Sequence, residues 1–228
     1  MLRSESMPRI TTRDEGKRDA LGMARDRTIG DWLLALAAMV FVMIVIGGLT
    51  RLTQSGLSMV EWKPVTGWLP PLSEAQWQAA FDGYKQYPEY QKINYGMTLP
   101  EFKNIFWLEY IHRVWGRLIG VAFFLPFLFF LVRGWIGRQL IWPLTILFFL
   151  GGLQGALGWY MVRSGMIDHP DVSQYRLVAH LMAALALYSA LLWIAFGLRW
   201  PRPEGGAPAS PAARAWCVVI CGLVLATI

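Results

Sequence analysis

Four long apolar stretches constrain this chain more than any other feature of its sequence. They cover residues 32–50, 105–132, 139–162 and 176–198, and short links that contain arginine join the last three. A helix needs roughly 20 apolar residues to cross a bilayer, and only helices and closed barrels satisfy their backbone polar groups there. Charged residues make up 16% of the chain, whereas soluble domains contain about a quarter. The sequence therefore predicts an all-α polytopic membrane protein with a four-helix transmembrane bundle.

The two ends of the chain lie outside this predicted bundle. Residues 1–31 mix seven Arg or Lys with six Asp or Glu and contain no apolar run, so they are not a signal peptide and are interpreted as a mobile cytoplasmic tail. Residues 199–214 are interpreted as a cytoplasmic linker. The apolar run at 215–228 has 14 residues, too few to span a bilayer. We interpret it as the truncated start of a fifth transmembrane helix, in a fragment of a longer protein.

Arginines in the links predict the orientation of the bundle. Those that follow the second and fourth spans are Arg133, Arg138, Arg199, Arg202 and Arg214. Because short cytoplasmic loops are enriched in Lys and Arg, we expect these links and the N-terminus on the cytoplasmic side. The loops at 51–104 and 163–175 then face the outer compartment.

The long outer loop, residues 51–104, carries helical signals of its own. Ser73 with Gln76, and Thr98 with Glu101, have the spacing of a capping box at a helix start, and the second pair starts the second spanning helix near Leu99. The aromatic residues of the loop fit two alternatives: a layer at the membrane interface or a small aromatic core. These residues are Trp62, Trp68, Trp77, Phe81 and Tyr84.

The net charge of +6 does not indicate nucleic-acid binding. The basic residues are scattered and flank apolar runs, as anchors at membrane surfaces do. The only two cysteines, Cys217 and Cys221, are spaced i, i+4 in an apolar run and match no zinc motif. The partner that this composition predicts is a lipid bilayer.

Two of the three histidines lie at matching depths in the predicted spans. His112 follows about seven residues of the second span, and His180 follows about four to six residues of the fourth. Both spans run from outside to inside, so at ~1.5 Å per residue both side chains lie roughly 6–11 Å below the outer surface. His169 lies in a loop and is interpreted as a surface residue. The matched pair is well placed to ligate one metal from opposite sides; the alternative is that each histidine is a structural hydrogen-bonding residue and that the glycines near them serve helix packing.

Haem iron is the metal that suits such a pair. Zinc normally takes four ligands, whereas a porphyrin supplies four and leaves two axial positions for imidazoles. Gly116 and Gly120 follow His112 on its own helix face and leave room for a flat ligand. The glycines of the third span that permit close helix approach are Gly151, Gly155 and Gly158.

Charged side chains at this level indicate chemistry as well as binding, because ionisable residues within a membrane are functional by default. Glu109 lies one turn before His112 on the same face. An enzyme that moves protons needs such a carboxylate, whereas an electron carrier does not. Arg113 is expected to pair with neighbouring carbonyls or a haem propionate. The arginines near the outer boundary, where propionates find countercharges, are Arg51, Arg163 and Arg176.

Four sequence blocks, in this order, resemble the haem A synthase family. They read GGLTRLTQSGLSMVEWKPVTGWLPP, EYIHRVWGRLIG, GGLQGALGWYMV and YRLVAHL. The resemblance covers roughly residues 30–200 and points to the proteobacterial and mitochondrial branch, which fits the absence of a cysteine pair from the first outer loop. It implies an eight-helix membrane protein with two pseudo-symmetric four-helix halves, of which this chain carries the first. The implied activity is oxidation of the C8 methyl group of haem O to a formyl group, which gives haem A for cytochrome c oxidase.

Residue by residue, the resemblance implies that His112 and His180 ligate the iron of the substrate haem and that Glu109 is catalytic. Arg113 and Arg176 are further candidates for haem binding. The implied reaction is two successive hydroxylations followed by loss of water, with Glu109 accepting a proton or stabilising positive charge at the methyl carbon. A b-type haem that accepts electrons is expected in the other half, so we expect the isolated chain to bind at most one haem weakly and to sustain no turnover.

The same resemblance implies partners and a location. The partners are haem O, haem O synthase and the cytochrome c oxidase assembly machinery, and a homo-oligomer is a further expectation. The location is the bacterial inner membrane. Two alternatives from other classes stay open: a bis-histidine membrane cytochrome for electron transfer, and a haem-delivery or assembly factor.

Overall fold

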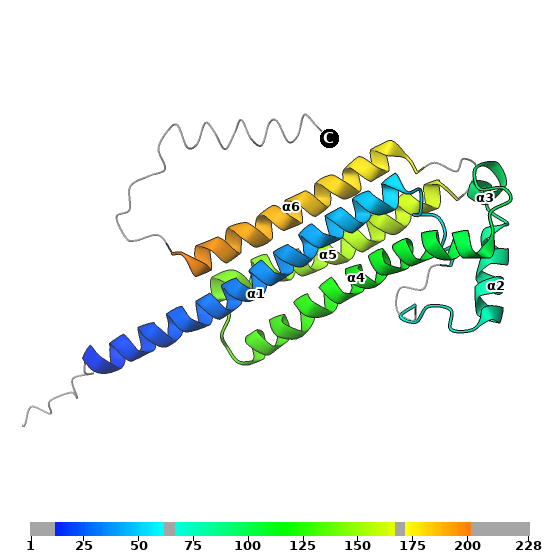
Figure 1. Cartoon of the computed structure of the whole chain (residues 1–228). Coiled ribbons are helices and arrows are strands. Elements are labelled where there is room, and N and C mark those ends of the chain that lie inside the picture. The colour runs from blue at the N-terminus through cyan, green and yellow to red at the C-terminus, as the bar shows by residue number, and fades with distance from the viewer. Residues whose placement is uncertain (1–11, 62–66, 167–171, 202–228) are drawn as a thin grey trace, which may run out of the picture.

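The computed structural model describes residues 12–61, 67–166 and 172–201, and these residues form helices and loops without a strand. Figure 1 shows the helices, which are α1 (Thr12–Leu52), α2 (Glu74–Tyr84), α3 (Pro88–Lys92), α4 (Leu99–Val132), α5 (Arg138–Ser164) and α6 (Gln174–Arg199). Four of them are long and apolar enough to cross a membrane: α1 from Ala20 onward, α4, α5 and α6. The predicted all-α polytopic membrane fold is confirmed.

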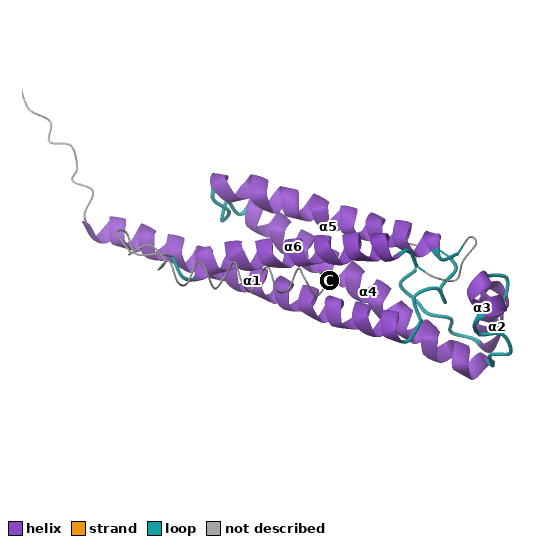
Figure 2. Ribbon diagram, turned by 90° about the horizontal axis from the view of Figure 1, so that it is seen from above, coloured by secondary structure: helices purple, strands orange, loops and turns teal. Residues whose placement is uncertain are grey.

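The four long helices form one bundle, and α2 and α3 lie together at one end of it (Figures 1 and 2). α1 packs against α4 and α6, and α5 packs against the same two helices. α4 and α6 therefore occupy opposite corners of the bundle and run in the same direction. We call the end with α2 and α3 the loop end, and the opposite end the far end.

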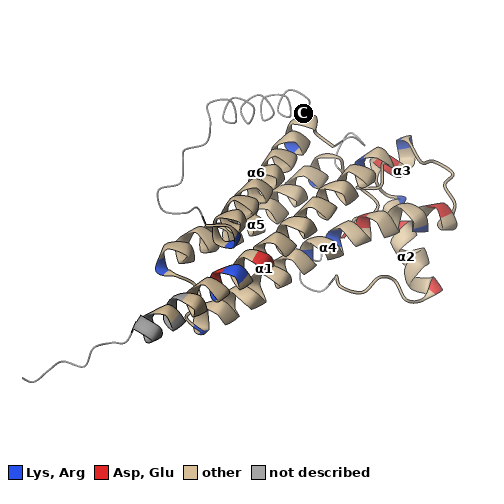
Figure 3. Cartoon of the chain, turned by 60° about the vertical axis from the view of Figure 1, so that its left-hand side comes forward, with Lys and Arg blue, Asp and Glu red and all other residues tan. Residues whose placement is uncertain are grey.

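Charged residues gather towards the two ends of the bundle, and long middle sections of the described helices carry none (Figure 3). This distribution is what hydrocarbon requires, because a charge at the bilayer centre is costly. It agrees with the spans that the sequence predicted.

Helix α1 begins well before residue 32, where the sequence predicted that the first span starts. Residues 12–31, interpreted above as a tail, are helical. The physical reason is packing, since Ile29 and Leu33 are fully buried. Asp31 Oδ1 also accepts a hydrogen bond of 3.0 Å from Arg199 Nε of α6. These contacts hold the first span and the helix before it in one element.

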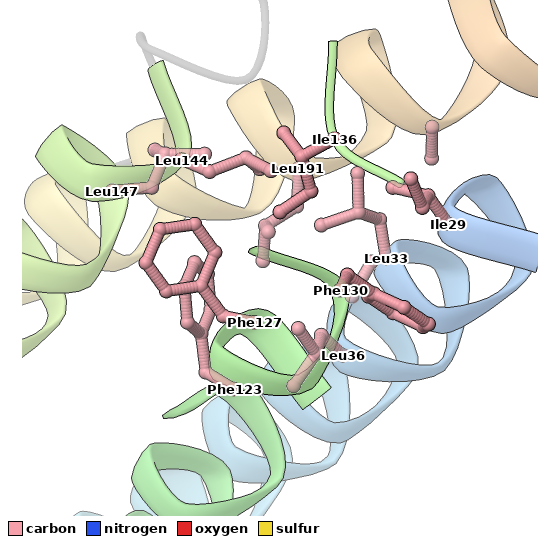
Figure 4. Close-up of a cluster of buried hydrophobic side chains, with 12 residues drawn as sticks. Ile29, Leu33, Leu36, Phe123, Phe127, Phe130, Ile136, Leu144, Leu147 and Leu191 are labelled. Atoms are coloured by element: carbon pink, nitrogen blue, oxygen red, sulfur yellow. The ribbon is translucent and has the colours of Figure 1, made fainter. Parts of the chain in front are cut away.

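The far half of the bundle contains a continuous apolar core (Figure 4). It is built from α1, α4, α5, α6 and the link at Ile136, and three phenylalanines of α4, Phe123, Phe127 and Phe130, lie in it. Two indoles tie α1 to α4: Trp32 Nε1 donates to Ala122 O, and Trp115 Nε1 donates to Met39 O, both at 2.9 Å. Interhelical hydrogen bonds of this kind hold helices together in lipid, where apolar burial provides little driving force.

The loop end is closed by a second, aromatic core. Trp77, Phe81 and Tyr84 of α2 are buried against Phe102 and Phe106 of α4. For Trp77, Phe81 and Tyr84 the structure therefore shows the small core, whereas Trp68 is exposed and lies outside it. Both predicted capping boxes are confirmed, at the starts of α2 and of α4.

Several predictions lie outside the described residues. These are the interpretations of residues 1–11, the linker from residue 202, the fifth helix, Trp62, His169, Cys217 and Cys221.

Candidate functional site

The two predicted ligands, His112 and His180, lie between the two apolar cores. His112 precedes Phe123 by 11 residues on α4, and His180 precedes Leu191 by 11 residues on α6, so both lie about 16 Å along the helix axis from the far core. At this level the buried side chains are mostly polar, and they include Thr50, Ser58 and Glu109. The level of the histidines thus buries fewer apolar side chains than the two cores on either side of it.

Each histidine packs against a glycine of a neighbouring helix. An added Cβ at Gly47 of α1 would lie 3.2 Å from His112 Nε2, and one at Gly158 of α5 would lie 2.9 Å from His180 Cε1. Real Cβ atoms do not approach other atoms so closely without a shift, because protein interiors are close-packed. Glycine at both positions therefore gives the imidazoles their room.

The other glycines that the sequence singled out behave differently. A Cβ at Gly116 would meet Met43 of α1 at 3.3 Å, and one at Gly120, Gly151 or Gly155 would meet nothing within 4 Å. The prediction that the three glycines of α5 permit close helix approach is thus wrong for Gly151 and Gly155. Gly158 makes room for an imidazole rather than for a helix backbone.

The two imidazoles come from opposite corners of the bundle and lie close enough to interact electrostatically. His180 Nδ1 is buried and has no hydrogen-bond partner among the described residues. The same part of the chain contains no group of three His, Cys, Asp or Glu residues that could hold a metal ion. Two histidines suit an iron whose porphyrin supplies the other four ligands, so the residues fit a haem better than a bare metal ion.

Glu109 lies one turn nearer the loop end and is 3% exposed. Its Oε2 accepts hydrogen bonds of 2.7 Å from Ser58 Oγ and from the Met59 backbone N–H. Its Oε1 is paired with the guanidinium of Arg113 on the next turn of α4. Three donors around one carboxyl group fit a carboxylate, because charge-assisted hydrogen bonds are the strong ones.

Arg113 also holds the segment that returns from α1. Its guanidinium donates to Met59 O at 2.9 Å and to Glu61 O at 3.2 Å, so the predicted pairing with neighbouring carbonyls is confirmed. Sequence reasoning missed Ser58 and Met59 as partners of Glu109. The signal available was "SGLSMVE" in a loop that precedes Glu109 by about 50 residues, and nothing in the sequence gives its return path.

A cavity of about 380 Å³ opens at the loop end between α4, α5 and the segment after α1. Arg113 and Arg163 line it together with apolar side chains such as Val60 and Trp159. Arg176, the other arginine predicted to bind haem, instead donates to Tyr160 O at 3.0 Å, and its guanidinium carbon lies 3.8 Å from the centre of the Tyr160 ring. The charge of this cavity suits an acidic group of a ligand.

A second buried carboxyl group, that of Glu89 of α3, lies at the loop end, in the part that α2 and α3 form. We call α2 and α3 together the cap. It accepts a hydrogen bond of 2.9 Å from Tyr84 Oη, which in turn accepts one of 2.8 Å from Asn94 Nδ2. Burial, and to a lesser extent the negative charge of Glu109, raise the pKa of Glu89 to about 7. Burial likewise raises the pKa of Tyr84.

These features define a class: a multi-pass helical membrane protein with a pair of histidines between opposite helices and a carboxylate beside one of them. The sequence model of the COX15-CtaA family, described as cytochrome oxidase assembly protein, matches residues 30–228. The chain belongs to this family.

Curated relatives are similar over most of this chain. A haem A synthase from Paramagnetospirillum magneticum is 50% identical over 221 residues, which cover 95% of this chain and 62% of that protein. One from Rhodospirillum centenum is 56% identical (84% of this chain, 50% of that protein), and one from Parvibaculum lavamentivorans is 57% identical (77% and 51%). The chain therefore spans only about half of the length of these relatives. No solved structure matches it.

Proposed function

We propose that this chain is the substrate-binding half of a haem A synthase, which oxidises the C8 methyl group of haem O to a formyl group. The observation that carries the proposal is the histidine pair, with His112 set against Gly47 and His180 set against Gly158. The family and the names of the bacterial relatives agree with it.

In this proposal His112 and His180 bind the iron of haem O from its two faces and so orient the ring. The acidic propionates of the ring point to the loop end, where Arg113 and Arg163 line the cavity and Arg176 lies nearby. Arginine suits carboxylates because its planar guanidinium matches them. The b-type haem that accepts electrons belongs to the half of the protein outside this chain.

Glu109 acts in this proposal as the catalytic carboxylate. Because Ser58, Met59 and Arg113 all donate to it, its better role is to stabilise positive charge that develops at the methyl carbon rather than to accept a proton. Preorganised charges aimed at the reacting atom are among the largest contributions to catalysis. Ser58 and Arg113 would then be positioning residues for Glu109.

The test is Glu109→Gln in the full-length protein, with Glu89→Gln as the matched control, since both carboxyl groups are 3% exposed. We expect Glu109→Gln to keep bound haem O and its spectrum but to lower haem A formation at least about 100-fold. Glu89→Gln should retain most of the activity. Normal haem A formation by Glu109→Gln would exclude the catalytic role and favour an electron carrier. Transfer of unchanged haem to a partner would indicate a delivery factor.

A further inference from the structure

An apolar groove lies between α5 and α6, directly beside His180. Its volume is about 220 Å³. α5 contributes leucines from Leu147 to Leu157 together with Gln154, and α6 contributes alanines from Ala183 to Ala190. On α5 the groove starts at Leu157, directly before Gly158, which contacts His180, and it runs towards the far end. We call it the α5/α6 groove.

Among the described residues, Gln154 is the one polar residue that lines the α5/α6 groove. Its Nε2 donates a hydrogen bond of 2.7 Å to His180 O. This bond fixes the orientation of the Gln154 amide. The backbone carbonyl of His180 can only accept a hydrogen bond, so the NH₂ group of Gln154 must face it and Oε1 must face away. Gln154 Oε1 is buried and has no hydrogen-bond partner among the described residues. Buried acceptors normally have a donor, so a donor on a bound molecule would complete this site.

The chemistry of the groove selects one substituent of the proposed substrate. Haem O differs from protohaem by a hydroxyethylfarnesyl tail, which carries one hydroxyl group next to the ring and a long apolar chain beyond it. The propionates are charged, and the methyl and vinyl groups are short. From Leu147 to Leu157 the groove extends about 15 Å along α5, which is comparable with an extended chain of three isoprene units. Leucine and alanine side chains suit such a chain, because apolar surface is buried favourably against them.

We propose that the α5/α6 groove binds the hydroxyfarnesyl tail of haem O and that Gln154 Oε1 accepts a hydrogen bond from the hydroxyl of the tail. This inference rests on the proposed function, since it takes haem O as the molecule held by His112 and His180. The tail then points along the helices away from the loop end, and the propionates point to Arg113 and Arg163. The groove and Gln154 make the site specific for haem O over protohaem.

The test compares haem O with protohaem, using the full-length protein in detergent. Each haem is titrated, and the absorbance change that depends on His180 is obtained by subtracting the His180→Ala variant. Gln154→Met should lower the affinity for haem O about two- to tenfold, the value of one neutral hydrogen bond, and should leave protohaem unchanged. Ala183→Leu, which fills the groove, should lower haem O affinity tenfold or more and again leave protohaem unchanged.

Ala156→Leu is the matched control, because Ala156 is exposed on α5 and does not line the groove; it should change neither affinity. Binding of protohaem by each variant also shows that the variant is folded. Equal losses for both haems, or no loss for haem O, would overturn the assignment of the groove while the histidine pair stands. If the wild-type protein shows no His180-dependent binding of either haem, the proposed function itself is wrong.

Discussion

Gly158 and Gly47 show how single residues shape this site, since each leaves a space that an imidazole occupies. Gly158→Ala places a methyl group 2.9 Å from His180 Cε1, so the ring has to move. Overpacking of this kind costs about 1–3 kcal/mol, and we expect haem affinity to fall roughly five- to 150-fold. Absorbance titration of the full-length variant measures this loss.

The control for this substitution is Gly155→Ala on the same helix. A Cβ at Gly155 meets nothing within 4 Å, and alanine favours a helix by about 0.5–1 kcal/mol over glycine. Gly155→Ala should therefore bind haem normally and unfold at the same or a higher temperature. If both variants lose haem affinity equally, the contact between Gly158 and His180 does not determine haem affinity.

The partners of Glu109 mark the limit of what the sequence predicts at the scale of residues. The spacing of Glu109 and His112 gives a shared helix face from local geometry alone. The hydrogen bonds from Ser58 and Met59 depend instead on a loop that returns to α4 after some 50 residues, and no local pattern gives that path. The contact of His112 with Gly47 depends likewise on the angle between two helices.

Helices α2 and α3 form a cap whose stability depends on pH through Glu89. Burial in the folded cap raises the pKa of Glu89 to about 7 from its ordinary value of 4.5. The folded state therefore keeps its proton while the unfolded state loses it, and stability falls as pH rises from about 4.5 to about 7 and then levels off. At ~1.4 kcal/mol per pKa unit, the total is on the order of a few kcal/mol.

Glu89→Gln removes this titration, so the variant should unfold at a temperature that varies less between pH 5 and pH 8 than that of the wild type. Thermal unfolding in detergent, followed by tryptophan fluorescence, measures the difference. Glu74→Gln is the control, because Glu74 is exposed at the start of α2. An unchanged pH dependence in Glu89→Gln would show that another group is responsible.

At the scale of elements, the sequence predicted the boundaries of the four long helices within two residues with one exception, and it did not predict the short helix α3 (Pro88–Lys92). The spans predicted at 139–162 and 176–198 correspond to α5 (Arg138–Ser164) and α6 (Gln174–Arg199), because apolar length sets these limits. The exception is α1, which begins at Thr12. Its first turns are polar, and only the contact of Ile29 and Asp31 with the rest of the bundle shows why the helix extends beyond the apolar run.

The orientation of the whole molecule in the membrane is a prediction from its arginines. Reporter fusions after residue 85, in the cap, should report the outer side. Fusions after residues 135 and 206 should report the cytoplasmic side. The opposite result at any one of the three would mean that the loop end, with His112 and His180, does not face the outer compartment.

Buried apolar side chains are distributed unequally along the bundle, and this distribution affects where a large flat molecule can enter it. The far half contains a continuous apolar core, whereas at the level of the histidines the buried side chains include the polar Thr50, Ser58 and Glu109. Regions with few buried apolar contacts open locally at a lower free energy than the core. Backbone amides around His112 should therefore exchange with deuterated water faster than those around Phe127 on the same helix. Under the proposed function, a porphyrin would then enter between the helices near the loop end while the far half stays closed.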